Sequence, residues 1–242
     1  MVDSLQPHIF FNLLANELRW NLLRHLTRSD FRVQELVALL GKPQNLVSYH
    51  LKMLRDTQLV IERHSNVDAR DIYYSLDVDY LQALYQAAGK ELHPALTMNR
   101  ASGIKSEALR ILFLCTENSA RSQLAEGLLR FQSGKNIQAF SAGSIPTQIH
   151  PYAMRIATEM GIDLNSHYSK HVDEFRGQDF DYVITVCDLA REKCPVFFGG
   201  AQYIHWSLPD PVAAGDYGSF QAVAHQIQRR VEYFLLQNQL IA

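Results

Sequence analysis

The residues with the clearest chemical potential lie in the stretch CTENSARS, which runs from Cys115 to Ser122. The stretch follows the apolar run ILFL and leads into QLAEGLLRF, a pattern that indicates a buried strand, a short loop and a helix. Free backbone N–H groups and the positive end of the helix dipole bind a tetrahedral oxyanion at a helix N-terminus. The same positive potential favours the thiolate of Cys115, which is the nucleophilic form. Arg121 can hold two anion oxygens, and Ser122 can hydrogen-bond the thiolate. We therefore predict an oxyanion site, although a cysteine that ends a buried strand is also a common core residue.

The groups expected to surround the anion form one continuous run along the loop and the first helical turn. They are Thr116, Glu117, Asn118, Ser119, Ala120, Arg121 and Ser122. Asn118 is suited to the left-handed backbone that a tight cradle often needs.

Two further cysteines, Cys187 and Cys194, occur later in the chain with six residues between them. A phosphatase would need an acid for its leaving group, which Asp210 in SLPDP could supply, but it would need no further thiols. Cys187 ends the strand-like run FDYVITVC, so it can face the same crevice as Cys115. Both later cysteines could instead be ordinary buried residues, and their spacing without CxxC is weak for zinc. A thiol relay that gives two electrons to the oxyanion fits better, and arsenate, unlike phosphate, can be reduced in this way.

The elements that must position these residues alternate between strand and helix from residue 108 onward. The strand-like runs are LRILFLC, IQAFSAG, FDYVITVC and AQYIHW, and the helical ones continue through Phe131, PYAMRIATEMG and FQAVAHQIQRRVEYFLLQN. This alternation predicts an α/β domain over residues 108–242, with a four-stranded parallel sheet, helices on both faces and ligands at the C-terminal strand ends.

This half resembles the thioredoxin-coupled arsenate reductases, which share the low-molecular-weight tyrosine phosphatase fold. The resemblance covers about residues 109–238 and depends on FLCTENSARSQLAEG, SAG, VITVC, CP and HWSLPDP. It implies that Cys115 attacks arsenate while Arg121 holds its oxygens and Asp210 protonates the departing hydroxyl. It further implies that Cys187 attacks the Cys115–arsenic adduct, releasing arsenite. Cys194 then resolves the disulfide for reduction by thioredoxin, and no metal or organic cofactor is required.

Two details bear on this resemblance. Tyrosine phosphatases of the fold often carry tyrosines directly after Asp-Pro, whereas DPVAAGDY has small residues here, which favours the reductase. Some reductases of the group bind potassium beneath the loop, through side chains that match Asn118, Glu126 and Ser141. The fourth matching position is Lys170, so we expect its ammonium to replace the ion by pairing with Glu126.

The first half of the chain indicates consecutive short helices followed by a β-hairpin. In QNLVSYHLKMLRDT, the apolar residues Leu46, Val47, Leu51 and Leu54 are expected to share the buried side. This order predicts a winged helix-turn-helix domain over residues 1–88, with a linker over residues 89–107. The candidate DNA-binding residues are Gln44, Asn45, Ser48, Tyr49, Lys52, Arg55, Arg63 and Arg70. The alternative is a small helical domain with an ordinary polar face.

Residues 10 to 88 resemble the ArsR-type winged-helix repressors, through LANELRWNLLRHL, VQELVALLGKPQNLVSYHLKMLRDTQLV and DIYYSL. The resemblance implies a homodimer paired through the first and last helices, which binds operator DNA and releases it on sensing a metal or metalloid. Many such sensors carry a cysteine pair where DFRVQEL has Arg32 and Gln34, and no cysteine precedes Cys115. Thiolate sensing at that place is excluded, and the scattered histidines give no reason to assign a metal site.

Composition sets the outer limits. The 242 residues carry a formal net charge of −2, so charge alone does not indicate a nucleic-acid partner. Three cysteines form no disulfide framework, the N-terminus is unlike a secretory signal, and no apolar run is long enough for a membrane span, so we expect a cytoplasmic protein. The combined hypothesis is an arsenate reductase fused to a DNA-binding regulator. A tyrosine phosphatase with a regulatory head and a non-enzymatic oxyanion sensor are the alternatives.

Overall fold

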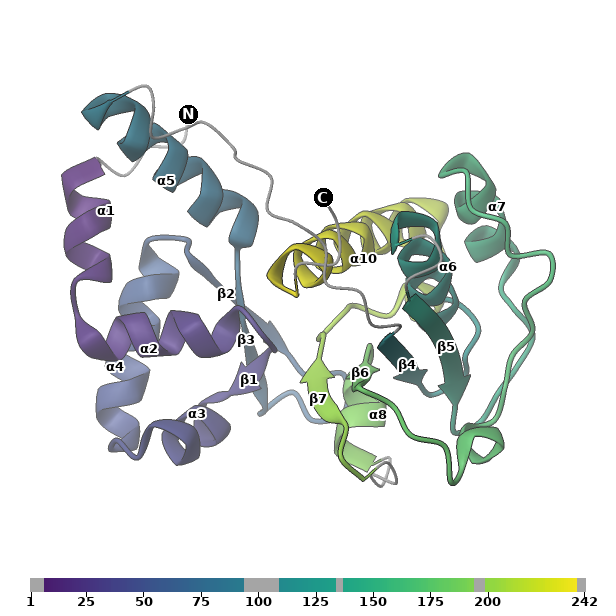
Figure 1. Ribbon diagram of the computed structural model, residues 1–242. Helices are drawn as coiled ribbons and strands as arrows, with labels where there is room; N and C mark the ends of the chain where they lie inside the picture. Colours follow the sequence, from purple (N-terminus) through teal and green to yellow (C-terminus); the bar gives the residue numbers. More distant parts are fainter. Residues whose placement is uncertain (1–6, 94–108, 134–136, 194–198, 239–242) are drawn as a thin grey trace. The chain divides into compact units, whose positions relative to one another are not determined.

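The computed structural model describes residues 7–93, 109–133, 137–193 and 199–238, which divide into two compact units between Ala101 and Ser102 (Figure 1). The first unit contains α1 (Pro7–Leu14), α2 (Glu17–Leu26), β1 (Phe31–Arg32), α3 (Val33–Leu40), α4 (Gln44–Asp56), β2 (Val60–His64), β3 (Ile72–Leu76) and α5 (Val78–Leu92). Among the helices of the described residues, none combines the length and apolar character that a membrane crossing requires.

The helix ends in the first unit follow local chemistry. Asn16 caps α2, because its side-chain oxygen accepts hydrogen bonds from the amides of Leu18 and Arg19 at 3.1 Å each. Helix α3 ends at Gly41, whose φ of 61° is the left-handed conformation that glycine adopts at low cost. Helix α4 then begins at Gln44, so α3 and α4 form the predicted helix–turn–helix.

The predicted hairpin is present and pairs β2 with β3 in antiparallel register, Val60 opposite Leu76. Two elements were not predicted. Strand β1 adds to the free side of β3, with Phe31 opposite Tyr74, and α1 precedes the predicted first helix. Helix α5 also continues past Ala88 to Leu92, so residues 89–92, predicted as linker, are helical.

The core of the first unit confirms the expected buried face of α4 except at one residue. Val47, Leu51 and Leu54 of α4 are buried. Leu46 was predicted to share that buried face, but 39% of its surface is exposed. It lies one residue before Val47, and a rotation of about 100° per residue on a helix turns it to the edge of the polar face.

The second unit contains β4 (Leu109–Cys115), α6 (Arg121–Ser133), β5 (Ile137–Gly143), α7 (Pro151–Glu159), the 3₁₀ helix η3 (Val172–Phe175), β6 (Tyr182–Thr185), α8 (Asp188–Lys193), β7 (Gln202–His205), α9 (Pro211–Ala214) and α10 (Tyr217–Gln237). The predicted four-stranded parallel sheet is present, in the order β5-β4-β6-β7.

The two faces of this sheet are packed differently. Ile111 and Phe113 belong to a core with buried residues of α6, α7 and α10, and Figure 1 shows α6 beside β4 and β5. On the opposite face, Phe140, Phe175 and Phe180 pack with ring centroids 5.7 to 5.9 Å apart. Cys115 is the last residue of β4, as predicted. The predicted strand through Cys187 ends earlier, at Thr185, so Cys187 lies two residues beyond the C-terminal end of β6.

Candidate functional site

The predicted oxyanion loop lies between the end of β4 at Cys115 and the start of α6 at Arg121. The Cys115 sulfur is 2.9 Å from the Ser122 hydroxyl and accepts a hydrogen bond from the Asn118 amide, also at 2.9 Å. The thiol is 5% exposed. Strand, loop and helix therefore place the sulfur at the base of a cradle, with the N-terminus of a 13-residue helix directed at it.

Asn118 holds the shape of this loop. Its φ of 51° is left-handed, as predicted, and its side chain is fully buried. The side-chain NH₂ donates to Ser122 at 2.9 Å and to Ser141 at 2.8 Å, while the side-chain oxygen accepts from the Lys170 amide at 2.8 Å. One side chain thus links the loop to α6, to β5 and to the segment before η3.

The carbonyl groups of the loop are bonded from outside. The amides of Ile145, Thr147 and His150 donate to the carbonyls of residues 116, 117 and 119, each at 2.9 Å. The carbonyl of residue 118 accepts from Gln123 at 3.1 Å and from Ser169 at 2.8 Å. Because these carbonyls are engaged elsewhere, the loop can present amide N–H groups to an anion.

Gly143 is a requirement of the site that the sequence pattern did not single out. It ends β5, and a Cβ atom there would lie 2.4 Å from the Thr116 carbonyl oxygen and 2.9 Å from the Asn118 nitrogen. Glycine allows the backbone of β5 to approach the loop this closely. The motif SAG contained the signal, but the contact that explains it joins residues far apart in sequence.

Arg121 and Asp210 come together as the prediction requires. The Arg121 Nη2 atom lies 3.0 Å from a carboxylate oxygen of Asp210, and Nη1 donates to the Leu208 carbonyl at 3.2 Å. Asp210 follows β7 and caps α9, since it accepts from the Val212 amide at 3.1 Å. The acid is therefore held beside the arginine that would grip the anion.

Cys187 lies on the same side of the sheet as Cys115. It directly precedes α8, is 3% exposed, and its sulfur is 3.5 Å from the Thr116 hydroxyl. Burial raises the pKa of the Cys115 thiol from 9.0 to about 11, and the nearby Cys187 thiol adds to this rise. Ser122, Arg121 and the Asn118 amide act in the opposite direction but do not outweigh burial, so the expectation that the loop favours the Cys115 thiolate is contradicted for the site without an anion. The Cys187 thiol thus opposes ionisation of the Cys115 thiol. Cys194 lies outside the described residues.

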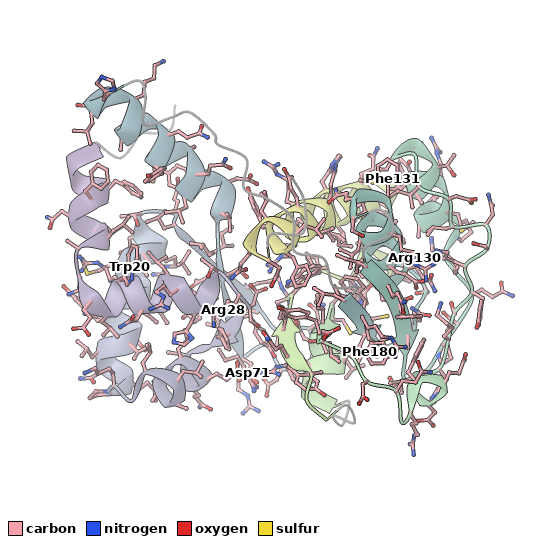
Figure 2. All side chains as sticks on the ribbon, viewed as in Figure 1. Trp20, Arg28, Asp71, Arg130, Phe131 and Phe180 are labelled. Carbon is pink, nitrogen blue, oxygen red and sulfur yellow. The ribbon has the colours of Figure 1, made fainter. Side chains whose placement is uncertain are left out.

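A buried ionic network around Glu126 lies next to the oxyanion loop and supports it. The Glu126 side chain is 2% exposed and accepts from the Ser141 hydroxyl at 2.6 Å. The predicted pair is present, with Lys170 Nζ 3.5 Å from Glu126, and Arg130 adds a second, unpredicted ion pair at 2.7 Å (Arg130 is labelled in Figure 2). Among the described residues, no three His, Cys, Asp or Glu side chains gather where they could hold a metal ion.

The candidate DNA-binding face lies on α4 of the first unit. Six of the predicted residues lie on this helix, and all but Arg55, which is half-buried, are exposed: Gln44, Asn45, Ser48, Tyr49 and Lys52. His50, on the same helix, is 8% exposed and lies on its inner face. The helix therefore presents a continuous face on which polar groups predominate.

The three predicted arginines all have partners within the unit. Arg55 pairs with Glu62 of β2 at 2.8 Å, and Arg70 pairs with Asp68 at 2.6 Å. Arg63 donates to Asn66 at 3.2 Å. A phosphate would have to compete with these groups for each arginine.

Arg32 stands where thiol sensors of the resembled family carry cysteine. It pairs with Asp71 at 2.8 Å and lies 3.7 Å from Glu35. Asp71, labelled in Figure 2, immediately precedes β3, so the pair ties the start of α3 to the hairpin.

A cysteine at the C-terminal edge of a parallel sheet, with an arginine guanidinium beside it, is typical of enzymes that act on tetrahedral oxyanions. Residues 110–241 match the family of low molecular weight phosphotyrosine protein phosphatases. The match spans more than half of the chain, so the chain belongs to this family. Residues 16–62 match the bacterial regulatory proteins of the arsR family, and the first unit therefore contains a helix-turn-helix domain of that family.

Individual relatives of the second unit are arsenate reductases. The arsenate reductase of Staphylococcus xylosus is 36% identical over 126 residues, which are 52% of this chain and 95% of the relative. The arsenate reductase of Staphylococcus aureus strain N315 is 34% identical over 126 residues, with the same two shares. A solved structure described as an arsenate reductase in the phosphate binding state is 29% identical and covers 53% of this chain and 98% of its own, with a TM-score of 0.49.

Proposed function

We propose that the second unit reduces arsenate to arsenite by a thiol–disulfide relay, and that the first unit is a DNA-binding regulator of arsenic resistance. The observation that carries the enzymatic part is a pair of buried thiols beside the C-terminal ends of the adjacent strands β4 and β6: Cys115 ends β4, and Cys187 lies two residues beyond β6. Cys187 affects the ionisation of Cys115 and lies 3.5 Å from the hydroxyl of the residue after it. A hydrolase of this fold would use Cys115 and would have no need of Cys187.

The first step is attack of the Cys115 thiolate on arsenic. The loop amides and Arg121 bind the equatorial oxygens, and Ser122 stabilises the sulfur charge through its hydroxyl at 2.9 Å. A sulfur–arsenic bond forms and an arsenic–oxygen bond breaks. Asp210, 3.0 Å from Arg121, donates the proton with which the departing hydroxyl leaves as water.

The second step reduces arsenic. The Cys187 sulfur attacks the Cys115 sulfur, and a disulfide forms between them. The sulfur–arsenic bond breaks, its electron pair passes to arsenic, and As(V) becomes As(III). The Cys187 proton passes to an arsenite oxygen, and arsenite leaves.

The third step transfers the disulfide to Cys187 and Cys194. Cys194 attacks the Cys187 sulfur, a Cys187–Cys194 disulfide forms, and Cys115 leaves as a thiolate. Thiol exchange of this kind requires mobility, so we expect α8 to loosen on oxidation. An external dithiol protein, thioredoxin by resemblance, then attacks the Cys187–Cys194 disulfide and returns both thiols.

We further propose that the enzyme needs no potassium. The Glu126 carboxylate has Lys170 at 3.5 Å and Arg130 at 2.7 Å, so two protein cations already offset its buried charge. A buried carboxylate without such partners would require a bound cation or a proton.

For the first unit we propose binding to operator DNA as a homodimer. The exposed face of α4 would enter the major groove. Apolar side chains on α1 and α5 remain exposed, with Phe11 at 40%, Tyr85 at 57% and Leu92 at 68%, and a second copy would cover them. Since Arg32 occupies the thiol position of related sensors, we propose that the reductase cysteines supply the arsenic response. Arsenite-driven release of DNA that persists in a Cys115/Cys187/Cys194→Ser variant would contradict this last step.

The deciding experiment is arsenate turnover with thioredoxin, thioredoxin reductase and NADPH. We expect NADPH oxidation that depends on arsenate, and a Cys194→Ser variant that completes one turnover and stops. Aryl-phosphate hydrolysis without arsenate turnover would identify a phosphatase instead. If neither activity occurs although the oxyanion binds, the second unit is a sensor.

A further inference from the structure

Behind Cys187 lies a buried polar cluster that the relay does not use. Asp188, the first residue of α8, and His205, the last residue of β7, both have side chains that are 0% exposed. The His205 Nε2 atom is 3.3 Å from the Asp188 carboxylate, and its Nδ1 is 2.9 Å from the Thr185 hydroxyl. The Ser207 hydroxyl donates to the same Asp188 oxygen at 2.9 Å. The cluster therefore joins α8, β6 and β7 at the C-terminal edge of the sheet.

A buried carboxylate is costly unless neighbouring polar groups compensate for the lost water. The Ser207 hydroxyl supplies a hydrogen bond, and the His205 ring closes the other side at 3.3 Å, so these two contacts hold Asp188 in place. Helix α8 has six residues and is too short to be stable in isolation. Its position must come from tertiary anchors, and the Asp188 side chain is one at its first turn. A carboxylate at this end also interacts favourably with the helix dipole.

Asp188 is joined to Cys187 by one peptide bond, so the anchor also sets the position of the sulfur. The Cys187 sulfur accepts a hydrogen bond from the Ala190 amide at 3.4 Å, and the Cys187 carbonyl accepts one from the Arg191 amide at 3.2 Å. Both bonds require the first turn of α8 to be formed. Release of Asp188 would loosen that turn and let the sulfur move away from Thr116.

We propose that Asp188 and His205 are positioning residues for Cys187: the buried pair keeps the first turn of α8 against β7, and thereby keeps the Cys187 sulfur in reach of Cys115. This inference rests on the proposed relay, in which Cys187 must attack the Cys115 sulfur. It assigns to the pair an effect on disulfide formation and none on anion binding.

The test compares Asp188→Asn with Asp216→Asn, each in a Cys194→Ser background. Asp216 likewise lies at the N-terminus of a helix, where it accepts from the Ser219 amide at 2.9 Å, but it takes no part in the cysteine site. Formation of the Cys115–Cys187 disulfide is followed by peptide mass spectrometry after rapid mixing with arsenate. Hydrogen peroxide serves as a second oxidant. It converts the Cys115 thiolate to a sulfenic acid, which Cys187 then attacks with loss of water.

Because a displacement of about 1 Å can cost about 100-fold in rate, we expect Asp188→Asn to slow the disulfide step by that order with both oxidants. Asp216→Asn should react like the parent. Protection of Cys115 from iodoacetamide by phosphate should be unchanged in Asp188→Asn, which shows that the protein is folded and binds the anion. Iodoacetamide should modify Cys187 faster in this variant.

Parent-like disulfide rates in Asp188→Asn would overturn the inference. If Asp188→Asn does not fold, His205→Gln is tested in the same way, and parent-like rates there have the same meaning. A Cys194→Ser parent that forms the Cys115–Cys187 disulfide with peroxide but not with arsenate would refute the proposed reductase, while the positioning role would still be decided by the peroxide rates.

Discussion

Replacing Gly143 with alanine should disable the oxyanion loop while leaving the fold in place. The new Cβ would lie 2.4 Å from the Thr116 carbonyl oxygen, whereas ordinary contacts begin at 3.4 Å. Both obstructing groups are backbone, at Thr116 and Asn118, so no side chain can rotate away. One of the two backbones must therefore move by about 1 Å, which is enough to misplace the amides that bind the anion.

The size of the effect follows from that displacement. A misplacement of about 1 Å at a reacting centre costs about 100-fold in rate, or about 2.7 kcal/mol of transition-state stabilisation. We expect kcat/KM for arsenate to fall by this order. Phosphate should also protect Cys115 from iodoacetamide less well, and this second assay is independent of turnover.

Gly127→Ala is the matched control. Its Cβ would lie 2.7 Å from Ile162 and 2.9 Å from Leu164, but these contacts are side-chain atoms in the core rather than the loop backbone. It should cost about 1–3 kcal/mol in the free energy of unfolding and leave phosphate protection intact. A folded Gly143→Ala protein with kcat/KM within threefold of wild type would refute the reasoning about the loop.

Three other predictions concern Lys170, Cys115 and Lys52. In Lys170→Asp the buried Glu126 gains a second carboxylate as neighbour, so arsenate turnover should become faster in KCl than in NaCl; a wild-type enzyme that is itself activated by KCl would contradict the role of Lys170. The raised pKa of Cys115 means that the unfolded chain ionises first as pH rises from 9.0 to about 11, so the stabilisation from the protonated buried thiol is lost across that range. The free energy of unfolding, measured by urea titration, should therefore fall between pH 8 and 11 in both proteins, but by about 2–3 kcal/mol less in Cys115→Ser than in wild type. Equal decreases would contradict the raised pKa. Lys52→Ala should weaken DNA binding and lower the slope of log K against log salt by about 1, as measured by fluorescence anisotropy; an unchanged slope would mean that Lys52 meets no phosphate.

Periodicity and local chemistry predicted much of the architecture. The four parallel strands, the hairpin and the helix–turn–helix all depend on apolar spacing, which each segment shows by itself. Strand β1 has two residues and is defined by pairing with β3, so no periodic pattern could indicate it. Gly89 suggested the start of a linker, yet it is buried in α5, which continues because tertiary packing outweighs the low helix propensity of glycine.

The candidate site was predictable where one motif carries it and was missed where distant segments meet. The strand–loop–helix order located Cys115, Asn118 and Arg121, because each role follows from neighbours in sequence. The need for glycine at position 143 arises from a backbone crossing, and the Asp188–His205 pair joins residues that become neighbours only in the folded sheet. Arg130 escaped notice because its partner Glu126, one helical turn earlier, is buried rather than solvated.

The external bonds to the loop carbonyls bear on how the site selects its substrate. Since residues 145, 147 and 150 fix the loop during folding, an arriving anion does not have to order it, and little conformational entropy is lost on binding. Such a rigid cradle recognises tetrahedral shape and charge, and it gives arsenate no advantage over phosphate at the moment of entry. Under the proposed function, the ratio of the two anions in the surroundings would then set how often arsenate occupies the site, and discrimination would occur only after binding, when Cys187 has an arsenic atom to reduce.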